Sequence, residues 1–400
     1  LFYTNQQHYL DKETADLMYD NPLYSSISKL ETFRQCAFCY FLKYGIRAEE
    51  RRLFQFNAMD LGILFHKALE EYPRRLERDN LSWRDIDNER MDQYVGEVVE
   101  DVVAQYGGSM GRPTAQNKYR VNQIKNMTKR AVSVLTDQLK LSKFEPKGYE
   151  VSFGEGGFPP IIVDIDHERK MLLTGTIDRV DIYQLENEEF IKILDYKSGK
   201  QTFDLLEVYY GLQLQLLLYL DAYLKMSKEG LPAGVFYFHI DNPLIEYKVG
   251  MSEEDVEKER AKKFKLSGLL LESIEIAKAL EEDVKGQVIP ASLKKDGEFS
   301  ASSSIATGEQ FDLLREHTID IIRELGQEIL NGKVSAMPYQ LNNKKPCDYC
   351  DYHSICQFDI TQKDNHYEKL PYFKKDEIWK KLNMQKGDMK NVDTRAKGSH

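Results

Sequence analysis

A predicted hairpin that joins two aspartates and a lysine constrains this chain more than any other sequence feature. The alternation of apolar residues predicts strands over residues 172–182 and 190–197, separated by a polar turn. Pairing across this turn places Asp178 opposite Asp195, roughly 5 Å away. Lys197 follows Asp195 by two residues, so both side chains project from the same face of the second strand. The hairpin therefore gathers two carboxylates and an amine at one place on a sheet.

Such a cluster suits a metal-dependent phosphodiesterase. Asp178 and Asp195 supply the oxygen ligands that Mg²⁺ and Mn²⁺ prefer, and a bound cation acidifies its water and screens phosphoryl oxygens. Lys197 would orient that water. The Tyr196 side chain points to the other face, but its backbone carbonyl reaches the ion if the strand twists or ends there. Two structural alternatives remain: a buried Asp–Lys salt bridge, or strand ends that emerge into solvent.

Length and composition describe an ordinary globular protein. The chain has 400 residues, enough for two or three domains, with 42% hydrophobic and 30% charged residues. Its net charge of −10 argues against a surface coated with basic residues, although an acidic nuclease can bind DNA through local basic strips and a metal. No apolar run reaches membrane-spanning length and no secretory signal is visible, so we expect a cytoplasmic protein. The first residue is Leu, which indicates a fragment or a processed chain.

Five cysteines lie near the two ends of the chain and indicate a metal site or cluster. Their odd number and the lack of a secretory signal argue against a disulfide framework. Cys36 and Cys39 with Cys347 and Cys350 would make a tetrahedral zinc site and leave Cys356 spare. Cys36 with Cys347, Cys350 and Cys356 would hold a [4Fe–4S] cluster and leave Cys39 spare. Either site would act as a clasp between distant segments, on the order of 5 kcal/mol by the loop-entropy argument.

The other patterns predict an α/β fold with a mixed sheet flanked by helices. Residues 1–24 read as a linker, 25–360 as the main domain with a helical insertion over 81–141, and 361–400 as a polar tail. The first helix, over residues 28–45, has a capping box of Ser28 and Glu31 and contains Cys36. Further helices are expected over residues 60–76, 205–224, 252–280 and 308–330, and further strands over 149–153, 160–165 and 234–240.

Two of these helices carry polar side chains that belong with the hairpin. The apolar helix after Lys197 presents Gln215 and Tyr219 one turn apart, as hydrogen-bonding groups toward a phosphate or the lysine. A core helix with satisfied polar tips is the alternative. The helix over 60–76 places Gly62 and His66 on one face, and His66 would add an imidazole ligand, although a single helical histidine is more often structural.

Several of these segments together resemble a known nuclease family. Gly62-Ile-Leu-Phe-His66, Gly175-Thr-Ile-Asp178-Arg, Asp195-Tyr-Lys197 and Gln215-Leu-Leu-Leu-Tyr219 resemble, in order and spacing, the motifs of RecB-type PD-(D/E)xK nucleases. One early cysteine and a late Cys-x2-Cys-x5-Cys resemble the iron–sulfur branch of that family, which includes CRISPR-associated RecB-like exonucleases and AddB-type nucleases.

The similarity is greatest to the C-terminal part of AddB-type subunits of bacterial ATP-dependent helicase–nucleases. It extends from about residue 25 to residue 358. The segments that carry it are Ser26-Ile-Ser-Lys-Leu-Glu-Thr-Phe-Arg-Gln-Cys36, Pro232-Ala-Gly-Val-Phe-Tyr-Phe-His-Ile240 and Pro346-Cys-Asp-Tyr-Cys350. Ala37 departs from the family pattern, which usually has proline after the first cysteine.

The resemblance implies a restriction-endonuclease-like PD-(D/E)xK fold and an assignment of site residues. The catalytic residues would be Asp178, Asp195, Lys197, Gln215 and Tyr219. The ligands of Mg²⁺ or Mn²⁺ would be His66, Asp178, Asp195 and Tyr196. A [4Fe–4S] cluster would bind Cys36, Cys347, Cys350 and Cys356, with Cys39 as an extra cysteine.

The implied activity is hydrolysis of single-stranded DNA, with degradation of the 5′-terminated strand during double-strand-break resection. An AddA-type helicase–nuclease subunit would supply the unwound DNA, since this chain has no Walker A motif. Three other hypotheses remain: a free-standing CRISPR-associated RecB-like exonuclease, a nuclease fold that only binds DNA with the cluster as a staple, and a zinc-ribbon interaction protein whose Asp–Lys hairpin is a salt bridge.

Overall fold

The computed structural model describes residues 8–49, 58–106, 114–154, 156–199, 201–227, 230–240, 250–252, 255–256, 259 and 262–397. The strands are β1 Leu23–Ser26, β2 Glu145–Phe153, β3 Ile161–Asp164, β4 Lys170–Leu185, β5 Glu188–Lys197, β6 Gly230–His239, β7 Ser267–Leu271, β8 Ile305–Ala306, β9 Tyr339–Leu341 and β10 Glu368–Leu370. The helices are α1 Lys12–Met18, α2 Ile27–Gln35, α3 Ala37–Tyr40, the π-helix η1 Phe41–Gly45, α4 Ala58–Arg78, α5 Asn88–Tyr106, α6 Ala115–Leu141, α7 Leu205–Tyr209, α8 Gln215–Met226, α10 Ile274–Leu280, α11 Gly308–Leu330, the 3₁₀-helix η3 Pro346–Tyr349, α12 His353–Cys356 and α13 Lys375–Lys397.

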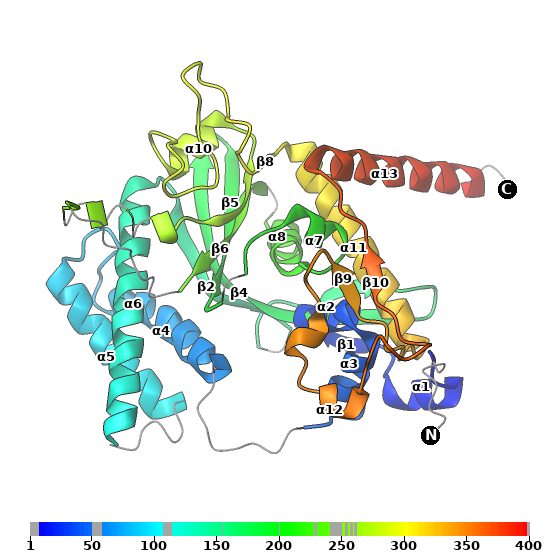
Figure 1. Cartoon of the computed structure of the whole chain (residues 1–400). Coiled ribbons are helices and arrows are strands. Elements are labelled where there is room, and N and C mark those ends of the chain that lie inside the picture. The colour runs from blue at the N-terminus through cyan, green and yellow to red at the C-terminus, as the bar shows by residue number, and fades with distance from the viewer. Residues whose placement is uncertain are drawn as a thin grey trace.

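The long strand β4 organises a mixed sheet of eight strands (Figure 1). The first part of β4 lies between β1, which is parallel to it, and β3, which is antiparallel. Its second part lies between the antiparallel strands β2 and β5. The sheet continues from β5 through β6 and β7 to β8. Because β5 and β6 are parallel, a crossover must join them, and α7 and α8 lie in that crossover.

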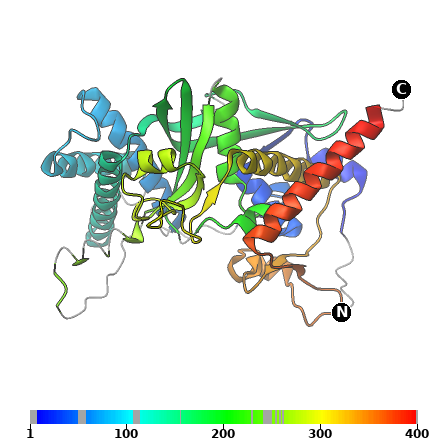
Figure 2. The same ribbon diagram turned by 90° about the horizontal axis from the view of Figure 1, so that it is seen from above.

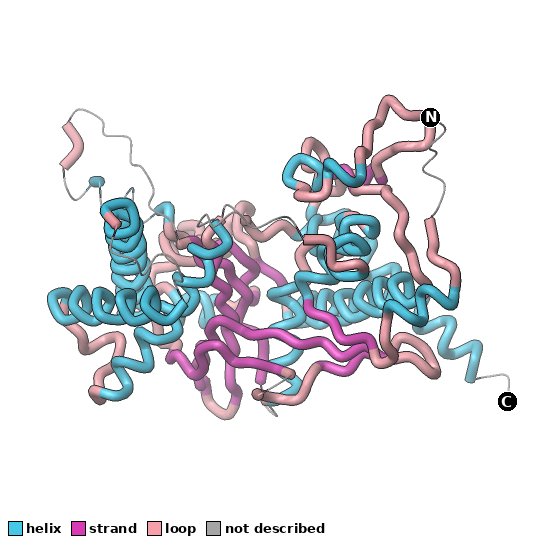
Figure 3. The backbone as a smooth tube through the Cα atoms, turned by 90° about the horizontal axis from the view of Figure 1, so that it is seen from below, coloured by secondary structure: helices cyan, strands magenta, loops and turns pink. Residues whose placement is uncertain are grey.

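Both faces of the sheet are covered by helices, which explains why β5 is apolar on both sides. Ile191 and Ile193 pack with α2, α8 and α11, whereas Phe190 and Leu194 pack with α4, α5, α6 and α10. Figures 2 and 3 show α4–α6 on one side of the strands and α11 and α13 on the other. In the described part of the chain, no helix combines the length and apolarity that a membrane crossing requires. This arrangement is the predicted α/β fold, a mixed sheet flanked by helices.

The helix predicted over residues 28–45 is wrong in three respects. The helix α2 begins one residue earlier than predicted, and the residue at its N-cap, Ser26, makes no side-chain cap, so the predicted box of Ser28 and Glu31 does not form. Cys36 ends α2 with an extended backbone, φ −167° and ψ 114°, and so lies between two helices instead of within one. The next helix, α3, passes into the π-helix η1. Glu31 is thereby left for a contact with another element.

Two other predicted helices are interrupted. The helix over 205–224 is broken between α7 and α8, because Gly211 has a φ of +75° that a helix cannot contain. The helix over 252–280 contains the strand β7, whose short apolar run cannot be distinguished from a helix by periodicity. Gly268 permits this strand, because a Cβ there would lie 2.0 Å from the carbonyl oxygen of Val235 on β6.

The two predicted terminal extensions contain ordered elements. The segment 1–24 includes α1, where Ala15 is buried, and the start of β1. The segment 361–400 includes β10 and α13, and Ile378, Trp379 and Leu382 of α13 join the hydrophobic core. These three residues form a narrow apolar stripe in an otherwise charged helix, which is why composition alone concealed it.

Candidate active site

The structure brings Asp178 and Asp195 together where β4 and β5 meet. The ladder ends with the pair of Arg179 and Leu194, as predicted for the hairpin, and the two aspartates are the next residues on the two strands beyond this pair. The backbone N–H of Tyr196 donates a hydrogen bond of 2.6 Å to Oδ2 of Asp178. Both aspartates are buried, at 7% and 1% exposure. Two buried carboxylates so close together require compensating charge.

A closed set of contacts joins Asp195 to the predicted lysine and glutamine. The Nζ of Lys197 lies 2.7 Å from Oδ2 of Asp195 and donates to Oε1 of Gln215 at 2.7 Å. The Nε2 of Gln215 donates to Oδ1 of Asp195 at 2.6 Å and to the hydroxyl of Tyr219 at 3.2 Å. The first turn of α8 therefore holds the lysine amine in place. Gln215 contacts the hairpin directly, and Tyr219 contacts Gln215.

His66 of α4 lies in the same site, together with Glu150, which was not among the predicted site residues. The Nδ1 of His66 lies 3.3 Å from Oδ1 of Asp178 and 4.0 Å from Oε1 of Glu150. One ligand atom from each of the three residues lies within 4.8 Å of the others. His66, Glu150 and Asp178 thus form a group that could bind one cation.

Glu150 enters the site through the pairing of β2 with β4. Tyr149 pairs with Arg179 and Val151 with Ile177, so Glu150 stands opposite Asp178. The sequence did place Glu150 in a strand, since a strand was predicted over residues 149–153. Its register could not be assigned, since β3 intervenes between β2 and β4 and no short turn links them. The φ of Glu150 is +47°, an uncommon backbone conformation for a non-glycine residue.

The electrostatics of this group favour a bound cation. Burial and the charge of Asp178 raise the pKa of Glu150 to about 7, and the same two causes raise the pKa of Asp195 to about 7. Burial acts to lower the pKa of His66, but the hydrogen bond to Asp178 and its charge outweigh this effect and leave the pKa raised. A set of carboxylates and an imidazole with excess negative charge fits a divalent metal ion.

The side chain of Tyr196 lies on the opposite face of β5 from Asp195, as the strand alternation predicts. Its ring packs edge to face against His66, with centroids 6.1 Å apart, and against Phe238 at the same distance. Tyr196 therefore supports the imidazole from behind. Ligation of the metal by its carbonyl oxygen stays a prediction.

Two glycines of the predicted motifs are explained by close packing at the site. A Cβ on Gly175 would lie 2.7 Å from Cζ of Phe153 and 3.3 Å from Cε1 of Tyr219. A Cβ on Gly62 would lie 3.3 Å from Oγ of Ser198. Gly175 therefore lets the Tyr219 ring approach β4, and Gly62 lets α4 approach the residue after Lys197.

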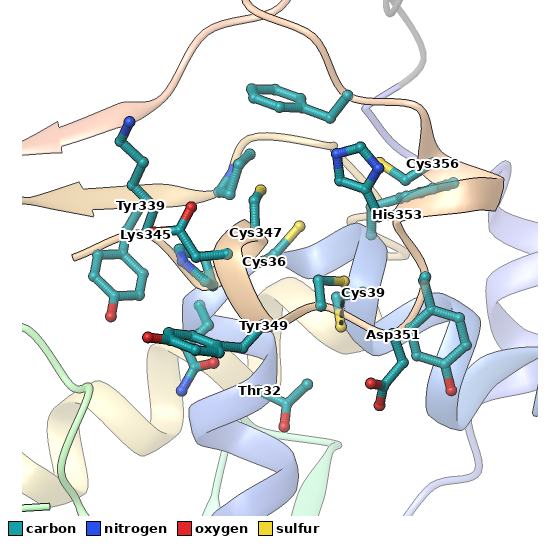
Figure 4. Close-up of a pocket in the computed structure, with 18 of the residues that line it drawn as sticks. Thr32, Cys36, Cys39, Tyr339, Lys345, Cys347, Tyr349, Asp351, His353 and Cys356 are labelled. Carbon is teal, nitrogen blue, oxygen red and sulfur yellow. Dashed lines mark hydrogen bonds between the residues drawn. The ribbon is translucent and has the colours of Figure 1, made fainter. Parts of the chain in front are cut away.

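All five cysteines line one cavity of about 580 Å³ (Figure 4). Cys36 and Cys39 come from the α2–α3 segment, whereas Cys347, Cys350 and Cys356 come from η3, its C-cap and α12. The sulfurs of Cys39 and Cys350 are 3.9 Å apart. The two distant segments therefore meet at their cysteines, and a metal or cluster that clasps them stays a prediction. Because Cys39 also lines this cavity and lies beside Cys350, the zinc set and the iron–sulfur set are both available here.

Comparison with known proteins identifies the family of this chain. The sequence profile of the PD-(D/E)XK nuclease superfamily matches residues 24–357. The chain is 38% identical over 390 residues to the B-type subunit of the ATP-dependent helicase/deoxyribonuclease of Alkaliphilus oremlandii, an alignment that covers 96% of this chain and 34% of the relative. The corresponding protein of Clostridium tetani is 40% identical over 384 residues, covering 94% and 33%, and that of Clostridioides difficile is 37% identical over 401 residues, covering 97% and 34%. The chain spans about a third of the length of these curated relatives. The predicted resemblance is confirmed, and the chain belongs to the PD-(D/E)XK nuclease superfamily.

Proposed function

We propose that this chain is a divalent-metal-dependent deoxyribonuclease that hydrolyses phosphodiester bonds of single-stranded DNA. One observation carries the proposal: Glu150, Asp178 and Asp195 converge with His66 beside the amine of Lys197. A buried Asp–Lys salt bridge alone would need neither the additional carboxylates nor the histidine. The zinc-ribbon hypothesis is therefore the weaker interpretation of this hairpin.

The side chains have separable roles in this proposal. His66, Glu150, Asp178, Asp195 and the carbonyl of Tyr196 would hold Mg²⁺ or Mn²⁺. When bound, such a cation supplies an acidified water and screens the charge of the phosphate. Lys197 has three N–H donors, of which Asp195 and Gln215 engage two, so the third remains to orient the attacking water or a phosphoryl oxygen.

Gln215 and Tyr219 complete the catalytic set. Gln215 keeps the lysine amine beside Asp195 through its two amide contacts. Tyr219 is buried, and its hydroxyl accepts a hydrogen bond from Gln215, which leaves its own proton for a phosphate oxygen. Exclusion of water around these groups strengthens each charge interaction with the phosphate.

We further propose that the cysteine cavity holds a [4Fe–4S] cluster on Cys36, Cys347, Cys350 and Cys356. The Cys-x2-Cys-x5-Cys spacing and the convergence of all four residues on one cavity support this set. A zinc ion bound by Cys36, Cys39, Cys347 and Cys350 is the competing assignment. Either group would tie the segment after α2 to the segment before α13.

The larger role we propose is processing of the 5′-terminated strand at double-strand breaks, together with an AddA-type helicase–nuclease subunit. The support comes from the relatives, which are B-type subunits of ATP-dependent helicase/deoxyribonucleases. The chain has no Walker A motif, so the energy for unwinding would come from outside it. These names favour the helicase-linked role over that of a free-standing CRISPR-associated exonuclease.

Cleavage of labelled single strands tests the proposal. The anaerobically purified chain is incubated with Mg²⁺ and with 5′- or 3′-labelled single-stranded DNA, beside Asp195→Ala and the control Asp164→Ala, an exposed aspartate on β3. We expect Mg²⁺-dependent cleavage that Asp195→Ala abolishes and Asp164→Ala retains, and the fragment pattern gives the polarity. Binding of DNA without cleavage by the parent chain would favour the DNA-binding module instead.

A further inference from the structure

A glutamate on α2 lies at the start of α8, behind the catalytic lysine. Glu31 is partly buried, and its Oε1 accepts a hydrogen bond of 2.7 Å from the backbone N–H of Leu214. The nearby backbone N–H of Gln215 also acts to lower the pKa of this carboxylate. Glu31 thus satisfies the backbone N–H of Leu214 at the start of a helix that belongs to a distant part of the chain.

The start of α8 needs this contact because it has no cap of its own. Leu214 occupies the N-cap position, and its apolar side chain makes no capping hydrogen bond. The first N–H groups of a helix lack partners within it, and a negative charge near them is favourable. Glu31 therefore serves as an N-cap supplied by another helix. The helix that it caps begins with Gln215 and carries Tyr219 one turn later.

Glu31 interacts electrostatically with residues of the site. The charge of Lys197 favours its ionised form, whereas burial and the nearby Glu207 oppose it. On the other side, the negative charge of Glu31 acts on the hydroxyls of Tyr219 and Tyr237. The ring of Tyr237 in turn lies 5.4 Å from Nζ of Lys197. Glu31 and the catalytic amine therefore share one enclosed environment.

We propose that Glu31 is a positioning residue of the nuclease site: its carboxylate anchors the start of α8 and thereby keeps Gln215 and the amine of Lys197 aligned with Asp195. This inference rests on the proposed nuclease function. The helix that carries Glu31 also borders the cysteine cavity, since Thr32, Gln35 and Cys36 line it (Figure 4). A displacement of α2 at the cavity would consequently move Glu31 and, through α8, change the position of the lysine amine.

Steady-state kinetics on single-stranded DNA test the positioning role. In Glu31→Ala we expect kcat to fall by about 10- to 100-fold with little change in KM, because misplaced catalytic groups cost rates of this order. Glu31→Gln, which keeps an acceptor oxygen for the backbone N–H of Leu214, should recover part of the loss. The matched control is Thr307→Ala, which removes the N-cap of α11 and should leave kcat unchanged. An unchanged kcat in a folded Glu31→Ala variant would overturn the proposal, and so would a Gln variant no better than Ala.

A second measurement does not depend on cleavage. Glu31→Gln is combined with Lys197→Met in a double-mutant cycle, and thermal unfolding of the four proteins is compared. We expect the shift in melting temperature caused by Glu31→Gln to differ between the two lysine backgrounds. If the parent chain does not cut DNA, the proposed function fails, yet a non-zero coupling still supports the Glu31–Lys197 link. Strict additivity would refute that link whether or not the chain is a nuclease.

Discussion

Replacement of Glu31 by glutamine should stabilise the chain at alkaline pH while it impairs the site. Burial is the main cause that raises the pKa of Glu31 from 4.5 to about 7, against the opposing effects of the Leu214 N–H and Lys197. An acid whose pKa is raised by folding favours the folded state fully below the unfolded value of 4.5. That contribution is lost as the pH rises through about 7. The ionised carboxylate is therefore a net cost to the fold at alkaline pH.

The shift sets the size of the effect. One pKa unit corresponds to about 1.36 kcal/mol, so the ionisation of Glu31 costs at most about 3 kcal/mol. Glu31→Gln removes this cost and keeps an oxygen for the N–H of Leu214. An unfolding entropy of about 2 cal/mol/K per residue converts that figure to about 3–4 °C for a chain of 400 residues. We therefore expect the variant-minus-parent difference in melting temperature to increase by this amount as the pH is raised from about 5 to about 8.5.

Differential scanning calorimetry without added divalent cation measures this difference. Comparison of variant and parent at each pH cancels the carboxylates of the metal site, which both proteins contain. The charged and titratable groups that face Glu31, namely Lys197, Glu207, Tyr219 and Tyr237, are also unchanged. Glu309→Gln, at an exposed glutamate in the first turn of α11, is the control and should show no such trend. A variant-minus-parent difference that is constant with pH would refute the reasoning.

Three further predictions concern the metal site and the cysteine cavity. Glu150→Ala should weaken Mn²⁺ binding by at least about 10-fold in isothermal titration calorimetry, whereas Glu145→Ala, at an exposed position on the same strand, should not; equal affinities would remove Glu150 from the ligand set. Gly175→Ala should lower stability by about 1–3 kcal/mol in denaturant and reduce kcat, because the new methyl group meets Phe153 and Tyr219; full activity would contradict this packing. Cys356→Ala should lose iron and broad visible absorbance while Cys39→Ala retains both, and the opposite pattern would reverse the ligand set.

The sequence was most informative where contacts are local. The hairpin of β4 and β5 has a short turn, so its register followed from the alternation of apolar residues, and Asp178 met Asp195 as predicted. The helix over residues 308–330 was predicted with its observed bounds, because an unbroken apolar stripe follows Thr307, which forms a capping box. In both cases a few neighbouring residues determine the structure.

The sequence failed where a distant partner decides the conformation. The extended backbone of Cys36 and the positive φ of Gly211 interrupt segments with good helical periodicity, and only packing against other elements reveals why. Glu150 was missed because its place opposite Asp178 depends on a register that no tight turn sets. Glu31 was interpreted as half of a local capping box, although its carboxylate caps a helix 183 residues away. Such roles follow from tertiary contacts alone.

The pairing of β4 has a consequence for the order in which the chain folds. Its partners β2, β3 and β5 are near it in sequence, whereas all the helices from α2 to α6 lie between β1 and β4 along the chain. Closing that large loop has the greater entropic cost, so the β2–β5 unit should form first and β1 should dock afterwards together with α2. In pulse-labelled hydrogen exchange, β4 amides bonded to β5 would gain protection before those bonded to β1. A folding chain would thus place the acidic residues of the site in a sheet before α2 docks and Glu31 can align the lysine. It would remain a poor nuclease until that last step.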